Sequence, residues 1–124
     1  MEQKYCIGTK SGNILWDIEK MLEDIALFGK PVSISTEELS ALSNFHGNPD
    51  YAMKTDVSKP LIIVSLCAGK KILIDGNHRL YKAMELGCKE MSCFCLTPQQ
   101  HKNYIVNFDE SLYKAVVDEF VHEN

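Results

Sequence analysis

The sequence predicts an α+β protein in which helices flank a small mixed β-sheet. Two β-branched apolar runs, Leu61–Val64 and Lys71–Ile74, are separated by a short glycine-containing connection and indicate a pair of central strands. Stretches with apolar residues at helical spacing lie before, between and after the expected strands. Because these elements do not alternate regularly, an α+β arrangement is favoured over a βαβ repeat. The length of 124 residues, 45% of them apolar, suits one domain over residues 1–124.

Residues 1–30 are expected to form a helical extension before the first strand. Ser11-Gly12-Asn13 supplies a turn and an N-cap. Apolar side chains then recur at helical spacing, at Ile14, Ile18, Met21, Ile25 and Phe28. Gly29 and Pro31 end this run, which predicts an amphipathic helix of about four turns.

A short strand and a second helix are expected next. Pro31–Ile34 has the composition of a strand, and Ser35 and Glu38 have the spacing of a capping box. The apolar residues that follow predict a helix over residues 36–45. Gly47-Asn48-Pro49-Asp50 breaks this helix, and the polar segment as far as Lys59 is expected to be a surface loop.

The two central strands lead into a third helix. Asp75-Gly76-Asn77 offers an N-cap for it. The pattern that follows predicts a helix over residues 78–86, which ends at Gly87. Its side chains expected in the core are Leu80, Ala83 and Met84.

The C-terminal part is expected to hold one strand and two short helices. Met91–Leu96 has the composition of a strand. Thr97-Pro98-Gln99-Gln100 has proline at the first helical position and a Thr-x-x-Gln box, so helices are expected over residues 97–124. The acidic segment 107–124 could be a helix in a homodimer or a solvated end, and the sequence leaves both open.

Charge is distributed unevenly along the chain. The formal net charge of −4 argues against a protein that binds duplex DNA through its whole surface. Residues 54–89 nevertheless carry six lysines and one arginine against three acids, whereas both flanking segments are acidic. The single arginine of the chain is Arg79. The lysines of this basic centre could form a solvated face or a rim that attracts nucleotide or nucleic acid, and they include Lys54, Lys59, Lys70 and Lys71.

The sequence predicts a cytoplasmic protein without a membrane partner. No stretch approaches the ~20 apolar residues of a membrane-spanning helix. The first residues lack the pattern of a secretory leader. The five cysteines are an odd number without Cys-x-x-Cys spacing, which fits free thiols in a reducing compartment.

Segment Ile72–Leu80 joins a strand through a glycine-containing turn directly to a helix. Such a junction leaves the first N–H groups of the helix unpaired, at the positive end of the helix dipole, and so favours an anion. Gly76 permits close approach of a phosphate, His78 adds a ring N–H donor, and Arg79 adds a planar fork for bidentate binding. With Asn77, these residues are the expected phosphate-binding set.

A purely structural interpretation fits the same residues. Asp-Gly-Asn is common turn chemistry, so Asp75 could form the turn and Asn77 could cap the helix. Arg79 could then pair with a carboxylate such as Glu85 or Glu38. The spacing alone leaves both interpretations open.

The run Ile74–Leu80, followed by Ala83, Leu86 and Gly87, resembles the Asp-Gly-x-His-Arg signature of the ParB/sulfiredoxin superfamily, which includes ParB-like nuclease domains. The resemblance extends to strands on both sides of the signature and covers about residues 31–106. It implies a small ParB/sulfiredoxin-like α+β domain whose signature helix holds the phosphates of a nucleotide. That nucleotide is ATP or CTP in different branches.

The signature residues separate the branches of this superfamily. Sulfiredoxins have a catalytic cysteine where this chain has Asn77, which argues against sulfiredoxin activity. Partition proteins carry a Gly-Glu-Arg-Arg motif and a downstream helix-turn-helix domain, neither of which is expected here. The kinase-like branch keeps Asp-Gly-x-His-Arg, which Asp75 and His78 preserve.

The resemblance implies Asp75, His78 and Glu38 as catalytic residues. Asp75 would contact a Mg²⁺ ion on the nucleotide or act as a base, and His78 and Arg79 would bind phosphate oxygens. Glu38 lies where the kinase-like branch keeps a catalytic glutamate, although it also fits as a capping carboxylate. The same groups could transfer a phosphoryl group or hydrolyse a phosphodiester. The alternative is a non-enzymatic regulatory or interaction module of a mobile element, linked to nucleotide or DNA.

Two further features of the sequence favour structural interpretations. A four-ligand zinc site could be formed by Cys88, Cys93, Cys95 and His101, but their spacing matches no known zinc motif. Small buried side chains are the favoured interpretation of these cysteines. His46, in the Gly47-Asn48-Pro49 loop, is expected to be solvated.

Overall fold

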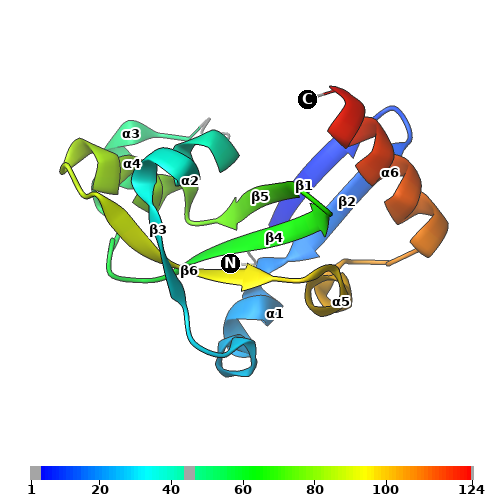
Figure 1. Ribbon diagram of the computed structural model, residues 1–124, viewed down its shortest axis with the longest axis horizontal. Coiled ribbons are helices and arrows are strands. Elements are labelled where there is room, and N and C mark those ends of the chain that lie inside the picture. Colours follow the sequence, from blue (N-terminus) through cyan, green and yellow to red (C-terminus); the bar gives the residue numbers. More distant parts are fainter. Residues whose placement is uncertain (1–3, 44–46, 124) are drawn as a thin grey trace.

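A computed structural model describes residues 4–43 and 47–123 of the chain (Figure 1). The strands in this part are β1 (Lys4–Thr9), β2 (Gly12–Asp17), β3 (Val32–Ser35), β4 (Leu61–Cys67), β5 (Lys70–Asp75) and β6 (Glu90–Leu96). The α-helices are α1 (Ile18–Glu23), α2 (Thr36–Leu42), α3 (Pro49–Ala52), α4 (Asn77–Glu85), α5 (Pro98–His101) and α6 (Glu110–Glu123). Two short 3-10 helices are η1 (Ile25–Phe28) and η2 (Lys102–Tyr104). The α+β class predicted from the sequence is confirmed.

A four-stranded mixed sheet forms the centre of the molecule, in the order β3-β6-β4-β5. The hairpin predicted between β4 and β5 is confirmed, and β3 pairs antiparallel with β6. β4 and β6 are parallel, with Leu61 opposite Cys93. The chain therefore crosses from β5 through α4 to β6, and this crossover carries the signature residues.

Both faces of this sheet are covered. Alternate residues of a strand point to opposite faces, so Ile62 and Val64 of β4 face one side while Leu61 and Ile63 face the other. The first side packs against the β1–β2 hairpin, α1 and α6, and the second packs against α2 and α4. Burial on both faces explains why β4 is a continuous apolar run, since a strand with one solvated face alternates.

Residues 4–17 form a β-hairpin, and the prediction of one helix from Ile14 to Phe28 is wrong. β1 and β2 pair antiparallel over their whole lengths as a separate two-stranded sheet. Ile14 and Trp16 are both buried, which fits a strand with one buried face. Figure 1 shows this hairpin beside α6, at the opposite end of the molecule from α3 and α4.

Helix α1 begins only after β2, because Asp17 caps it. The Asp17 carboxylate accepts the N–H of Lys20 at 3.0 Å. Ile18 and Met21 of this short helix are buried against the first face of the sheet. The apolar spacing that predicted a long helix is thus divided between a strand and a helix.

Helix α2 begins where it was predicted and ends earlier. The Ser35 hydroxyl accepts the N–H of Glu38 at 3.1 Å, and the helix ends at Leu42. Residues 44–46, including the predicted solvated His46, lie outside the described residues. The expected loop before β4 contains the short helix α3, whose first turn is capped by the Asn48 side chain.

Helix α4 is confirmed, with two differences from the prediction. Gly76 is its N-cap, and Asn77 is its first residue rather than its cap. Leu80 and Ala83 are buried as predicted, but the Met84 side chain is 47% exposed. Met84 lines the groove between α2 and α4, where its side chain stays accessible to solvent.

The C-terminal part packs on the hairpin side of the sheet. The predicted Thr97 capping box is present: the Thr97 hydroxyl accepts the Gln100 backbone N–H at 3.3 Å, and the Gln100 side-chain oxygen Oε1 accepts the Thr97 backbone N–H at 2.9 Å. α6 buries one apolar face there, formed by Tyr113, Val116 and Val117. Of the two alternatives left open by the sequence, a solvated end does not fit the buried face of α6, and a homodimer stays a prediction. None of the described helices has the length and apolar character needed to cross a membrane.

Candidate functional site

The signature residues lie at the junction of β5 and α4. Asp75 ends β5, Gly76 caps α4, and Asn77 starts the helix. Gly76 has φ +104°, in the left-handed region that favours glycine. A Cβ added to Gly76 would collide with the Leu61 side chain and would lie 2.8 Å from Arg79 Nη2. Both the backbone conformation and the available space therefore require glycine here.

Arg79 braces this junction. Its Nη2 donates to Asp75 Oδ2 at 2.9 Å and to the Pro60 carbonyl at 3.1 Å. The Arg79 and Asp75 side chains are only 17% and 16% exposed. Arg79 Nε is buried and has no hydrogen-bond partner within the described residues. The structural interpretation named Glu85 or Glu38 as the partner of Arg79, and this is wrong, because the side chain folds back one helical turn onto Asp75.

Asn77 and His78 are held by residues from the segment between the end of α2 and α3 and by α3 itself. The Ser43 hydroxyl donates to the Asn77 side-chain oxygen at 2.5 Å. The His78 ring packs edge-to-face on Tyr51, with 4.9 Å between ring centroids. The backbone at Gly47 is so close to His78 that an added Cβ would collide with Nε2. The first turn of α4 is therefore fixed in position by side chains from the preceding segment.

Glu38 lies apart from the signature. It is exposed on the first turn of α2, where its N–H is engaged by Ser35. Burial raises the pKa values of the Cys93 and Cys95 thiols, and the negative charge of Glu38 adds to that rise. Among the described residues, no hydrogen bond or ion pair joins Glu38 to the signature. The structure thus brings Asp75 and Arg79 together but does not bring Glu38 to them.

The chemistry open to this junction is anion binding beside a carboxylate. No family model, curated protein or solved structure matches the chain. The first N–H groups of α4 lack intrahelical partners by their position, at the positive end of the helix. The guanidinium of Arg79 adds positive charge, and the paired Asp75 carboxylate offsets part of it.

The lysines of the basic centre do not converge on this junction. Lys54 and Lys59 are exposed on the segment before β4. Lys82 of α4 donates to the Thr55 carbonyl at 2.6 Å and so ties that segment to the helix. Lys70 begins β5, at the opposite end of the strand from Asp75. The local charge at the signature therefore comes from Arg79 and the helix end.

The residues proposed for a zinc site are separated by the sheet. His101 contacts Trp16 and Tyr113 on the hairpin side, whereas Cys93 belongs to the cluster under α2 and α4. Burial raises the pKa of the Cys93 thiol to about 12, so it stays protonated. Within residues 4–43 and 47–123, no group of three or more potential metal-ligating side chains is gathered. The interpretation of these cysteines as small buried side chains fits Cys93, which is fully buried, and is wrong for Cys95, which is exposed.

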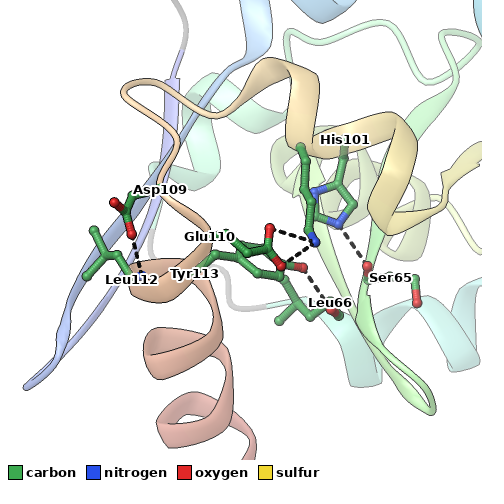
Figure 2. A network of polar contacts seen from close by, with 8 residues as sticks. Ser65, Leu66, His101, Asp109, Glu110, Leu112 and Tyr113 are labelled. Carbon is green, nitrogen blue, oxygen red and sulfur yellow. Dashed lines mark hydrogen bonds and ion pairs between the residues drawn. The ribbon is translucent and has the colours of Figure 1, made fainter.

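His101 instead belongs to a buried polar network (Figure 2). Its Nδ1 accepts the Trp16 indole N–H at 3.1 Å. Its Nε2–H donates to the Ser65 carbonyl at 2.8 Å. The Tyr113 hydroxyl donates to the Leu66 carbonyl at 2.7 Å beside it. Because one ring nitrogen accepts and the other donates, the ring is the neutral Nε2–H tautomer. This network joins the hairpin, β4, α5 and α6.

Three residues that hold the signature were not identified in the sequence. Ser43, Tyr51 and Pro60 come from segments as far as 34 residues before their partners. Pro60 indicates the start of a strand, since a proline just before an apolar run is typical there, but it does not indicate the contact with Arg79. Ser43 lies in the segment predicted to be helical and Tyr51 in the expected loop, and neither pattern indicates a contact with α4, so both contacts follow only from the tertiary fold.

Proposed function

We propose that the β5–α4 junction binds a phosphate group and that the chain is a nucleotide-binding domain of the ParB/sulfiredoxin type. The observation that carries the proposal is the position of Arg79, whose guanidinium lies against Gly76 at the N-terminus of α4. A fixed positive charge, a positive helix end and a glycine that exposes the backbone thus occupy one place. The order of strand, glycine turn and helix supports the resemblance found in the sequence.

Asp75 supplies the carboxylate that a nucleotide-bound Mg²⁺ ion requires. Magnesium at such sites is held by one or two carboxylates together with substrate phosphates and water, so a single aspartate fits. The ion would neutralise charge on the phosphates of ATP or CTP. Asp75 would hold it or take a proton from the attacking hydroxyl or water, while Arg79 and His78 orient phosphate oxygens. This arrangement would serve phosphoryl transfer or phosphodiester hydrolysis.

Binding without turnover is the second candidate function. Two observations favour it: Arg79 already holds one oxygen of Asp75, and Glu38 is not joined to the signature. A regulatory module that responds to a nucleotide or to nucleic-acid phosphate would need the anion site but no free base. Turnover by the purified protein distinguishes the two candidates.

Replacing Asn77 with aspartate tests phosphate binding. A carboxylate in the first turn stabilises the helix by about 0.3–1 kcal/mol but repels a phosphate at the same place. The wild type should gain about 2.7 kcal/mol of stability at a hundredfold excess of ligand over Kd, which raises Tm by several degrees. We expect Asn77→Asp to lose most of that gain, measured from its own Tm without ligand, because the change also removes the bond from the Asn77 amide to the Leu73 carbonyl. Thermal unfolding with MgATP, MgCTP, MgGTP and pyrophosphate measures it.

Asn103→Asp is the matched control, because Asn103 is exposed on η2, far from the signature in sequence and on another helix. It makes the same change in net charge and should leave the ligand-induced rise in Tm intact. Arg79→Ala is unsuited, since it also removes the brace to Asp75 and Pro60. A wild type whose Tm is unmoved by all four ligands contradicts the proposal, as does an unchanged shift in Asn77→Asp.

Asp75→Asn tests catalysis at the same site. The amide oxygen can still accept from Arg79, so the brace and the fold should survive. The variant should lose any Mg²⁺-dependent phosphate release or strand cleavage, because an amide neither takes up a proton nor provides an anionic metal ligand. Its rise in Tm with pyrophosphate in the absence of Mg²⁺ should remain, because that binding does not use the Asp75 carboxylate. Activity that persists in Asp75→Asn would show that the reaction occurs elsewhere, and a wild type that binds without turnover supports the second candidate.

A further inference from the structure

A second site lies outside the signature, in a cavity of about 440 Å³ beside the edge strand β5. Its walls come from four elements that are distant in sequence: β1, the end of α2, the start of β5 and Phe120 of α6. This volume lies within the ~300–1,000 Å³ typical of small-molecule sites. The cavity is therefore large enough for a ligand rather than for one or two water molecules.

The cavity lies between two open strand edges. Within the described residues, β5 pairs only with β4, and β1 pairs only with β2. Residues of β1 and β5 line the cavity, whereas none of β2 or β4 does. The outer edges of both strands therefore present backbone N–H and carbonyl groups toward the same space.

The charge of this lining has one sign. Its charged side chains are Lys70 and Lys71, and no carboxylate lines the cavity in the described part of the chain. The Lys70 ammonium lies over the Phe120 ring, 5.4 Å from the ring centroid, which holds it at the rim. Neither lysine forms an ion pair with another described residue. The lining is thus electrostatically suited to an anion.

Part of the remaining lining is aromatic or apolar. It includes Tyr5 and Phe120, together with Ile7 and Leu42. Burial and the nearby Cys6 raise the pKa of Tyr5, so its phenol stays neutral at physiological pH and can donate a hydrogen bond. Ring walls favour a flat apolar ligand, since stacking on aromatic faces adds to the burial of its surface.

We propose that this cavity binds a small organic anion with a planar apolar body, such as an aromatic carboxylate, sulfonate or phosphate ester. Lys70 and Lys71 bind the anionic group, and the Tyr5 and Phe120 rings hold the flat body. The site is separate from the phosphate site at α4. It approaches that site through Ser43, which lines the cavity and donates to Asn77.

Binding of anilinonaphthalene sulfonate, a fluorescent planar anion, tests the proposal on the folded protein. We expect one saturable site per chain. The double variant Lys70→Gln/Lys71→Gln should bind the probe about tenfold more weakly or worse, since two charged contacts to the sulfonate are lost. The control variant Lys54→Gln/Lys59→Gln removes the same charge from exposed positions and should bind as the wild type does. Tm is measured for each variant to show that it is folded.

Phenylnaphthylamine, which has the same rings without the sulfonate, separates charge from shape. Its binding should change little in Lys70→Gln/Lys71→Gln. Excess pyrophosphate, which is directed to α4, should leave the sulfonate probe bound, so this result does not depend on the proposed function. The proposal is overturned by the absence of a single saturable site, by equal weakening of both probes, by unchanged affinity in the double variant, or by displacement with pyrophosphate.

Discussion

At the scale of single residues, Gly76 combines two constraints that are usually separate. Its φ of +104° disfavours any side chain, and the space where a Cβ would lie is filled by Leu61 and Arg79. The Arg79 guanidinium can reach both Asp75 and the Pro60 carbonyl because nothing projects from residue 76 between them. The brace at the candidate site thus depends on the absence of one methyl group.

We therefore expect Gly76→Ala to cost about 2 kcal/mol or more of unfolding free energy, through backbone strain and through displacement of the Arg79 brace. Urea denaturation followed by the fluorescence of Trp16, the single tryptophan, measures the loss. Gly87→Ala is the matched control, because Gly87 has φ +76° but open space around its Cβ position. Its loss should be about 1 kcal/mol, from strain alone. Equal losses in the two variants would show that crowding at Gly76 has no role.

The residues of the candidate site could be predicted only where they are contiguous. Asp75, Gly76 and Arg79 follow one another at a strand-to-helix junction, so local rules place them together. The pairing of Arg79 with Asp75 rather than Glu85 depends on which way the side chain turns from the helix, and that is decided by the Pro60 carbonyl. No local pattern contains that contact.

At the scale of elements, the four strands of the mixed sheet could be predicted from their composition. β4 is a continuous apolar run, β3 and β6 are short segments with apolar residues between polar ones, and the Thr97 box defines the start of α5. The β1–β2 hairpin was missed because Lys10 and Ser11 at its turn are not the Asn-Gly or Asp-Gly pair that marks tight hairpins. Ile14 also has helical spacing to Ile18. The predicted helix therefore began at Ile14, four residues before α1, and included residues of β2.

The tip of this hairpin is joined to α6 through Glu119. Its carboxylate accepts the N–H of Lys10 at 3.2 Å and the N–H of Ser11 at 2.8 Å. Hydrogen bonds from Ser11 lower the pKa of Glu119 to about 2. A depressed pKa contributes stability that is present above the ordinary pKa of 4.5 and is lost as pH falls toward 2. The join between hairpin and helix should therefore persist at pH 5.

Glu119→Gln tests this join. One carboxylate oxygen is replaced by an NH₂ group, which cannot accept a hydrogen bond. One of the two N–H groups at the hairpin tip therefore loses its partner. We expect the Lys10 and Ser11 amides to exchange hydrogen several times faster, while amides in β4 keep their rates. Asp118→Asn is the control, since Asp118 is exposed and pairs only with His122 in the described part. Equal exchange at the tip in wild type and Glu119→Gln contradicts a holding role for Glu119.

At the scale of the whole molecule, His101 connects the β1–β2 hairpin, which the sequence did not predict, to the four-stranded sheet, which it did. Trp16 of the hairpin, Ser65 of β4 and His101 of α5 form one buried chain of hydrogen bonds. The hairpin also touches the C-terminal part at the isolated bridge between Trp16 and Ile105. The two sheets therefore share a core through a titratable ring, which couples global stability to pH.

Burial, partly countered by the bond to Ser65, lowers the pKa of His101 from its ordinary value of 6.5. Below that pH the unfolded chain binds a proton that the folded protein excludes, so the free energy of unfolding falls as pH falls. The slope approaches about 1.4 kcal/mol per pH unit for one proton. We expect urea denaturation to show this loss between pH 6.5 and 5. The pKa values of Asp56 and Glu119 are lowered from their ordinary values of 3.8 and 4.5. These two groups therefore reduce the unfolding free energy only at pH values near and below 4.

His101→Gln should remove this pH dependence, although it also lowers stability at every pH by altering the contacts with Trp16 and Ser65. The difference in unfolding free energy between pH 6.5 and pH 5 is therefore the readout, because a merely structural loss shifts both values equally. His122→Gln, at an exposed position on α6, should keep the wild-type slope. If His101→Gln loses as much stability between these pH values as the wild type does, the proton is taken up elsewhere, and the buried ring does not couple the two sheets to pH.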